Sequence, residues 1–299
     1  MWARRYDAAL ADFFALQDQI AESVVATIEP QLYAAENLRF KSRPPDSLDA
    51  WGLVMRAMPH VWDWGSPEDI KIAEALLDRA TTIDPNYPRA NSLLAWMLGA
   101  RAHLGLGDPT EILTTALAKA QRAIKNDPDD SWGHFAAGYV HMVSRHTKPA
   151  VEELKEAIDR NPSFAHAHVV LAATYAYAGK VDDSMGEAQL ATRLSPHDYT
   201  QAAALSTTGL CHLIGGRFQE AVGFERRAVQ LRPHFGTAWR TLSAAAGLAG
   251  DLGAAVSALA EATRLQPSLS IEWVEKYYAI AGEKDRALYI EGLRAAGLR

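Results

Sequence analysis

The sequence has a single cysteine, no long apolar run and no excess of positive charge. Only Cys211 among the 299 residues is a cysteine, so no disulfide can form within the chain, which fits a reducing compartment. No uninterrupted apolar stretch approaches the roughly 20 residues that a membrane span needs. Acidic residues follow Arg4 and Arg5 closely, which is unlike a secretory signal peptide. These features predict a cytoplasmic protein that does not contact a membrane.

The charge balance is slightly acidic, with 36 acidic against 30 basic residues and a net charge of −6. Binding to nucleic acid usually needs a basic face, so we expect no nucleic acid as the main partner. Apolar residues make up 48% of the chain, which is ample for a folded core. The sequence carries no phosphate-binding glycine motif, no dinucleotide fingerprint and no H-E-x-x-H. We therefore expect no cofactor.

Prolines recur at a nearly fixed interval through the second half of the chain. Pro128, Pro162 and Pro196 follow one another at intervals of 34 residues, as do Pro233 and Pro267, whereas the interval from Pro196 to Pro233 is 37. Each interval contains two amphipathic halves, which predicts two helices in each unit. A period of this length, with a proline at the close, is typical of tetratricopeptide repeats.

Small residues occupy the positions where the two helices of a unit should cross. With each closing proline counted as position 32, positions 20 and 27 hold alanine or serine throughout. The chain thus resembles the tetratricopeptide repeat family over 47–296. The resemblance implies an all-α, right-handed α-α superhelix of about six to seven helix pairs and an N-terminal helix. The repeats would close near Pro85, Pro128, Pro162, Pro196, Pro233 and Pro267, followed by a C-terminal capping pair.

Two repeats depart from the common length. The second runs 43 residues from Pro85 to Pro128, and we expect the excess in the turn between its helices, near Gly105 and Gly107. Neutral variation in length is favoured there over an added function, although insertions in solenoids often carry function. The fifth repeat is three residues longer than the common period of 34, which leaves its register open.

The N-terminal segment 1–40 reads as a separate amphipathic helix. One stripe of this helix would carry Phe13, Leu16, Ile20 and Val24. Pro30 should end or kink the helix. The stripe either packs on the first repeat, which is favoured, or forms a docking surface or a homodimer.

A second resemblance begins at Arg5-Tyr6-Asp7 and continues through Leu10 to Ile20. This segment is similar to one in bacterial proteins described as adenylate or guanylate cyclases or as transcriptional regulators, where it leads from a cyclase or winged-helix domain into the repeats. The ending Ile290 to Leu298 is also like the end of that family. The resemblance implies a C-terminal regulatory arm. No catalytic residues of a cyclase match here, so cyclisation is not implied.

The first helix of each repeat should line the concave surface, where partners of this family bind. The inward positions hold Trp132, Phe135, Tyr139 and Met142 in the third repeat, with Trp96 in the second and Arg240 in the sixth. An apolar, aromatic groove of this kind suits an amphipathic helix or a hydrophobic peptide. Alternatively, these aromatics pack between repeats, or the N-terminal helix covers them.

The sequence offers only weak candidates for catalytic or metal-binding residues. His134 and His141 share a helical face, but packing histidines are favoured over a zinc pair, and Cys211 reads as a small core residue. We therefore predict neither a catalytic site nor a metal site. The sequence predicts a non-enzymatic protein-interaction scaffold, with the regulatory or dimerising arm of a class III nucleotide cyclase or transcriptional regulator as the alternative.

Overall fold

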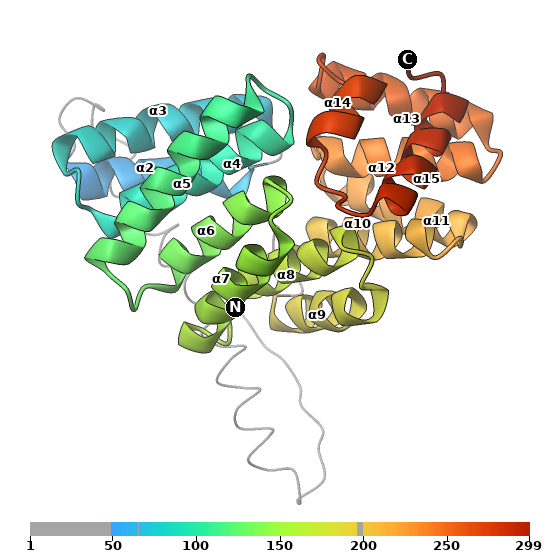
Figure 1. Ribbon diagram of the computed structural model, residues 1–299. Coiled ribbons are helices and arrows are strands. Elements are labelled where there is room, and N and C mark those ends of the chain that lie inside the picture. Colours follow the sequence, from blue (N-terminus) through green and yellow to red (C-terminus); the bar gives the residue numbers. More distant parts are fainter. Residues whose placement is uncertain (1–48, 65, 196–199) are drawn as a thin grey trace, which may run out of the picture.

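The structure is a computed structural model that describes residues 49–64, 66–195 and 200–299. These residues form fourteen helices and contain no strand (Figure 1). The helices are α2 (Ala50–Trp62), α3 (Pro67–Ile83), α4 (Pro88–His103), α5 (Pro109–Asn126), α6 (Ser131–Val143), α7 (Thr147–Arg160), α8 (Ala165–Tyr177), α9 (Val181–Leu194), α10 (Thr200–Ile214), α11 (Phe218–Leu231), α12 (Gly236–Leu248), α13 (Leu252–Leu265), α14 (Ile271–Tyr277) and α15 (Glu283–Ala295).

Consecutive helices pack as pairs, from α2 with α3 to α14 with α15, and the pairs stack into an all-α superhelix (Figure 1). This confirms the architecture expected from the period of 34 residues. In the pairs that a proline closes, the second helix ends in the same way: the N–H of the residue before the closing proline donates to the carbonyl of the alanine at position 27. Ala80, Ala157 and Ala262 are three of these acceptors.

The starts of several helices follow from their capping residues. The Ser66 hydroxyl accepts from the Asp69 N–H, and Pro67 begins α3, because proline suits the first helical position. Asp108 caps α5 by accepting from the Thr110 N–H at 2.8 Å. Asp49 caps α2 through the Gly52 N–H.

The extra length of the second repeat lies mainly in its helices. α4 and α5 contain 16 and 18 residues, against 13 and 14 in α6 and α7 of the next pair. The turn between α4 and α5 is only slightly longer than its equivalent, and Gly105 and Gly107 take positive φ angles there. The expectation that the turn holds the whole excess is therefore wrong. Each of these helices gains roughly a turn instead, because nothing in either one breaks the helical pattern.

The superhelix curls until its two ends face each other across the interior (Figure 1). The Ser268 hydroxyl donates to the Gly105 carbonyl at 2.7 Å, and the Ala281 N–H donates to the Tyr177 carbonyl at 2.8 Å. The last helix pair is therefore hydrogen-bonded to residues of the second and fourth pairs. Among the described residues, no helix is both long enough and apolar enough to cross a membrane.

Candidate functional site

The aromatic residues predicted to line the concave face lie together inside the superhelix. The Trp96 ring on α4 lies 5.1 Å from Phe135 and 5.9 Å from Trp132, both on α6. Tyr139 continues the row, 6.5 Å from Phe135. All of the predicted inner residues are at most 5% exposed, namely Trp96, Trp132, Phe135, Tyr139, Met142 and Arg240. The structure thus brings the aromatics together as a core and not as an open surface.

The turn that follows α2 packs against this aromatic row. The Trp62 ring lies 5.8 Å from Trp132, and the Trp64 ring lies 6.3 Å from Tyr139 and 5.2 Å from Phe235. The sequence pattern did not indicate Trp62, the last residue of α2, or Trp64, in the turn that follows it, as inner residues. Whether the inner aromatics bind a partner stays a prediction, and a partner would have to displace this turn to reach them.

Arg240 lies at the centre of the opposite wall, on α12. Its guanidinium donates to Gln266 Oε1 and to the Thr237 hydroxyl, and it stacks 4.7 Å from the Tyr278 ring and 5.1 Å from the Trp273 ring. No carboxylate within the described residues pairs with it. Aromatic faces and neutral oxygens therefore compensate this buried charge.

A small cavity of about 50 Å³ lies beside this cluster, lined by His103, Tyr139 and Tyr278 among others. Burial and the neighbouring Arg240 lower the pKa of His103 to about 3, so its imidazole is neutral at physiological pH. Burial also raises the pKa of Tyr139. The Tyr139 hydroxyl has no hydrogen-bond partner among the described residues. The cavity has room for a few water molecules that would satisfy such a hydroxyl.

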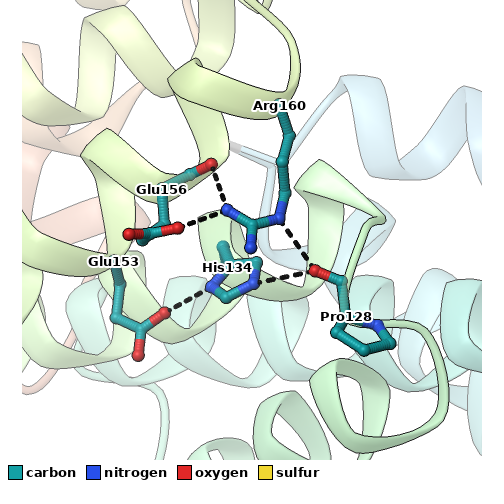
Figure 2. Close-up of polar contacts among 5 residues, drawn as sticks. All are labelled: Pro128, His134, Glu153, Glu156 and Arg160. Atoms are coloured by element: carbon teal, nitrogen blue, oxygen red, sulfur yellow. Dashed lines mark hydrogen bonds and ion pairs between the residues drawn. The ribbon is translucent and has the colours of Figure 1, made fainter.

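His134 ties two parts of its own repeat together and is not arranged as a metal ligand. Its Nε2 lies 3.2 Å from the Pro128 carbonyl and its Nδ1 lies 2.8 Å from Glu153 Oε2 (Figure 2). Both ring nitrogens face acceptors, so a doubly protonated ring satisfies both contacts. Arg160 donates to the same Pro128 carbonyl at 2.8 Å and pairs with Glu156. The ring therefore joins the turn before α6 to α7, the second helix of the repeat. We call this pair of contacts a histidine lock.

The same lock recurs one repeat later. His168 lies 2.7 Å from Glu187 Oε2 and 3.2 Å from the Pro162 carbonyl, and Trp239 donates to the Pro233 carbonyl from the equivalent position. His141, the proposed partner of a zinc pair, lies instead beside His146, with ring centroids 5.8 Å apart. Within the described ranges, no group of three or more His, Cys, Asp or Glu side chains could hold a metal ion.

Cys211 lies buried between helices, where its Sγ donates to the Ser184 hydroxyl at 3.2 Å. Burial raises the pKa of its thiol, so the thiolate that a nucleophile needs is disfavoured. The arrangement agrees with a small core residue.

The wider depression on the described surface lies at the outer edge of the array, between α5, the turn after α6 and α14. It has a volume of about 310 Å³. Leu113, Leu117 and Val143 form its apolar part, and Arg145, His146, Lys276 and Tyr277 form the remainder with Pro109 and neighbouring threonines. We call this depression the outer cleft. The sequence pattern did not indicate that these residues meet.

The predicted docking stripe, Phe13, Leu16, Ile20 and Val24, lies outside the described residues. A docking or dimer role for it stays a prediction.

Comparisons with known proteins agree with the repeat architecture. No family model matches the chain. Over 136 residues it is 31% identical to a putative adenylate cyclase 3 of Rhizobium meliloti, a match that covers 45% of this chain and 23% of that protein. The chain thus spans less than a quarter of that relative's length.

Two solved structures share the fold at low sequence identity. The human IFIT1 dimer with m7Gppp-AAAA has a TM-score of 0.58 and 14% identity, covering 82% of this chain and 57% of that one. The Cut9-Hcn1 hetero-tetramer of the APC/C has a TM-score of 0.57 and 15% identity, covering 82% and 44%. The tetratricopeptide repeat resemblance seen in the sequence is confirmed.

Proposed function

We propose that this tetratricopeptide repeat chain is a non-enzymatic protein-interaction scaffold with a regulatory role in signalling. The observation that carries the proposal is the stacking of helix pairs into one continuous surface, which is how repeat arrays present binding sites. Cys211 and His134, the weak candidates for a nucleophile and a metal ligand, make contacts within and between helix pairs. The proposed partner is a protein or peptide in the cytoplasm.

A second candidate is the C-terminal regulatory or dimerising arm of a nucleotide cyclase or transcriptional regulator. The match to a putative adenylate cyclase favours it, because the aligned part is only 23% of that much longer protein. In this case the array would dock on a catalytic or DNA-binding domain that the matched residues do not include. The reading frame upstream of Met1 separates the two candidates, since the second requires such a domain to be encoded there.

Affinity capture tests the scaffold role. The purified chain is used as bait in native lysate, captured proteins are identified after cross-linking, and each is reconstituted with the bait from purified components. We expect saturable binding of at least one protein. The absence of any reconstituted complex, together with turnover in an activity screen, would contradict a non-enzymatic scaffold.

Alanine at Trp132 or Phe135 tests the predicted role of the inner aromatics. Because both side chains are buried, we expect a loss of about 3–5 kcal/mol in the free energy of unfolding, measured by urea denaturation. Weaker partner binding with unchanged stability would instead support direct contact with a partner.

Light scattering on the intact chain tests the proposed homodimer. Glutamate at Leu16 and Ile20 should convert a dimer held by this stripe into a monomer. A molar mass that is unchanged by these substitutions would contradict a dimer through the N-terminal segment.

A further inference from the structure

The outer cleft combines an apolar part with cationic side chains from two distant parts of the chain. Leu113 and Leu117 lie one helical turn apart on α5, with Val143 at the end of α6 beside them. Lys276 and Tyr277 come from α14. The cleft therefore exists only because the superhelix curls and brings the last helix pair against the second and third.

The backbone of Arg145, in the turn beside the outer cleft, takes a conformation that costs free energy. The turn between the helices of a repeat needs a residue with positive φ, and Gly179, Gly216 and Gly250 supply it in other repeats. Arg145 takes the same left-handed conformation, with φ 61°, which costs a side-chain-bearing residue about 1 kcal/mol or more relative to glycine. Such a backbone outlier points to a role for the side chain.

The Arg145 guanidinium holds α14 in place through backbone carbonyls. It donates to the carbonyls of Tyr278 at 2.7 Å, Glu275 at 2.9 Å and Val274 at 3.2 Å. Each acceptor is a neutral carbonyl, and no carboxylate within the described residues forms an ion pair with it. These carbonyls carry only partial negative charge, so a net positive charge remains at the cleft.

Lys276 adds to this charge, and the His146 imidazole is a further hydrogen-bond donor at the cleft. His146 is exposed, and Lys276 lies 5.0 Å over the Tyr277 ring. Asp108 and Glu272 attract Lys276 electrostatically without a hydrogen bond to it. The Asp108 carboxylate also caps α5. Burial lowers the pKa of both Arg145 and His141. Arg286 lowers the pKa of Arg145 further, and His146 lowers that of His141 further. These like charges repel, and a bound anion would relieve the repulsion.

We propose that the outer cleft docks an acidic segment of a partner protein, with apolar side chains on Leu113 and Leu117 and carboxylates facing Arg145, His146 and Lys276. The inference rests on the proposed scaffold function and deepens it. Charge complementarity selects this occupant, since a cationic cleft on a chain of net charge −6 favours acidic partners and steers their association.

Fluorescence anisotropy with short labelled peptides tests the proposal on the intact chain. One peptide interleaves Asp and Glu with Leu and Phe, a second replaces its acids by lysine, and a third replaces its apolar residues by serine. We expect saturable binding of the first peptide only, weakened by added salt. Equal binding of the lysine peptide would overturn the proposal, and so would equal binding of the serine peptide.

Substitutions locate the binding. Lys276→Glu should weaken the acidic peptide about fivefold to tenfold, and Leu113→Ser should weaken it without changing its salt dependence. Lys125→Glu is the matched control, because it makes the same charge change at an exposed position of α5 outside the cleft. Equal losses in both lysine variants would mean that net charge, and not the cleft, governs binding. Thermal melting confirms that each variant is folded.

A single-stranded RNA of similar charge provides a second arm. If it competes at the same concentration as the acidic peptide and loses affinity in Lys276→Glu, the cleft binds polyanions and the peptide assignment is overturned. The captured partner from the scaffold experiment distinguishes failure of the outer-cleft proposal from failure of the scaffold proposal. A partner that binds wild type and Lys276→Glu equally would overturn the cleft and leave the scaffold role intact.

Discussion

Arg232 and Asp63 form an ion pair of 2.6 Å although 169 residues separate them in the chain. The same guanidinium donates to the Trp62 carbonyl at 3.1 Å and lies 5.7 Å from the Trp64 ring. One arginine at the end of the fifth repeat thus holds the end of α2 and the turn after it, where Trp62 and Trp64 pack on the inner aromatics.

Arg232→Met tests the importance of this link. We expect the free energy of unfolding to fall by about 1–3 kcal/mol, because the substitution removes the hydrogen bonds of a buried guanidinium to the Trp62 carbonyl and to Asp63. Arg264→Met removes an exposed pair with Glu261 and should cost less than about 0.5 kcal/mol. Urea denaturation measures both. Equal effects of the two substitutions would show that the contact between the first and fifth repeats adds nothing to stability.

Glu225 should make the stability depend on pH. It is fully buried on α11, where its Oε1 accepts from the Ser206 hydroxyl at 3.1 Å and its Oε2 has no partner. Burial raises the pKa of this carboxyl well above its usual 4.5. The folded chain therefore binds this proton more tightly than the unfolded chain does, so the contribution to stability falls as pH rises above 4.5.

Glu225→Gln removes this titration while keeping the shape of the side chain. We expect the variant to be more stable than wild type at pH 8 and the difference to shrink toward pH 4.5. Urea denaturation at a series of pH values provides the comparison. Glu220→Gln, on the same helix and near its start, is the control and should leave the pH profile unchanged.

The two histidine locks should contribute separately. His134→Gln and His168→Gln should each lower the free energy of unfolding by about 1–2 kcal/mol, because each removes the imidazole contacts to a carboxylate and to a proline carbonyl. The double variant should show the sum, since the sites lie in different repeats and share no partner. His234→Gln changes an exposed histidine and should be neutral. A cost in the double variant that equals either single one would contradict independent locks.

The last helix is held by a close crossing of two glycines. A Cβ on Gly247 of α12 would lie against the Gly292 carbonyl, and a Cβ on Gly292 of α15 would lie against the Ala244 carbonyl. Gly292→Ala should therefore cost about 1–3 kcal/mol in thermal or urea unfolding.

Gly223→Ala on α11 is the matched comparison for this substitution. Nothing lies within 4 Å of a Cβ at that position, and alanine favours a helix by about 1 kcal/mol over glycine. It should stabilise the chain. A Gly292→Ala variant that is also stabilised would mean that α15 can move off α12 without loss.

The regular part of the fold was predictable because its signals are local. Periodic prolines, small crossing residues and capping side chains such as Ser66 and Asp108 act within one repeat. The contacts between the two ends of the superhelix were not predictable, because they depend on how a small rotation per repeat accumulates along the array. Trp62 and Arg232 carry no pattern that links them.

Two individual residues did carry a signal in the sequence. Glu225 stands at position 24, where Leu154 and Leu259 pack in other repeats, and an acid there marks a buried polar group. Arg145 stands at position 15, where Gly179 and Gly250 close their turns. Comparison of equivalent positions across repeats would have found both. Neither position by itself shows that Arg145 reaches α14.

The contacts between Gly105 and Ser268 and between Asp63 and Arg232 fix the number of repeats that this array can contain. In an open solenoid a unit can be added or deleted and the rest remains unchanged. Here an inserted pair would push the two ends out of register, and a deleted pair would leave them too far apart to touch. Variation in repeat number should therefore be selected against in this protein, whereas point changes on its outer helices are tolerated.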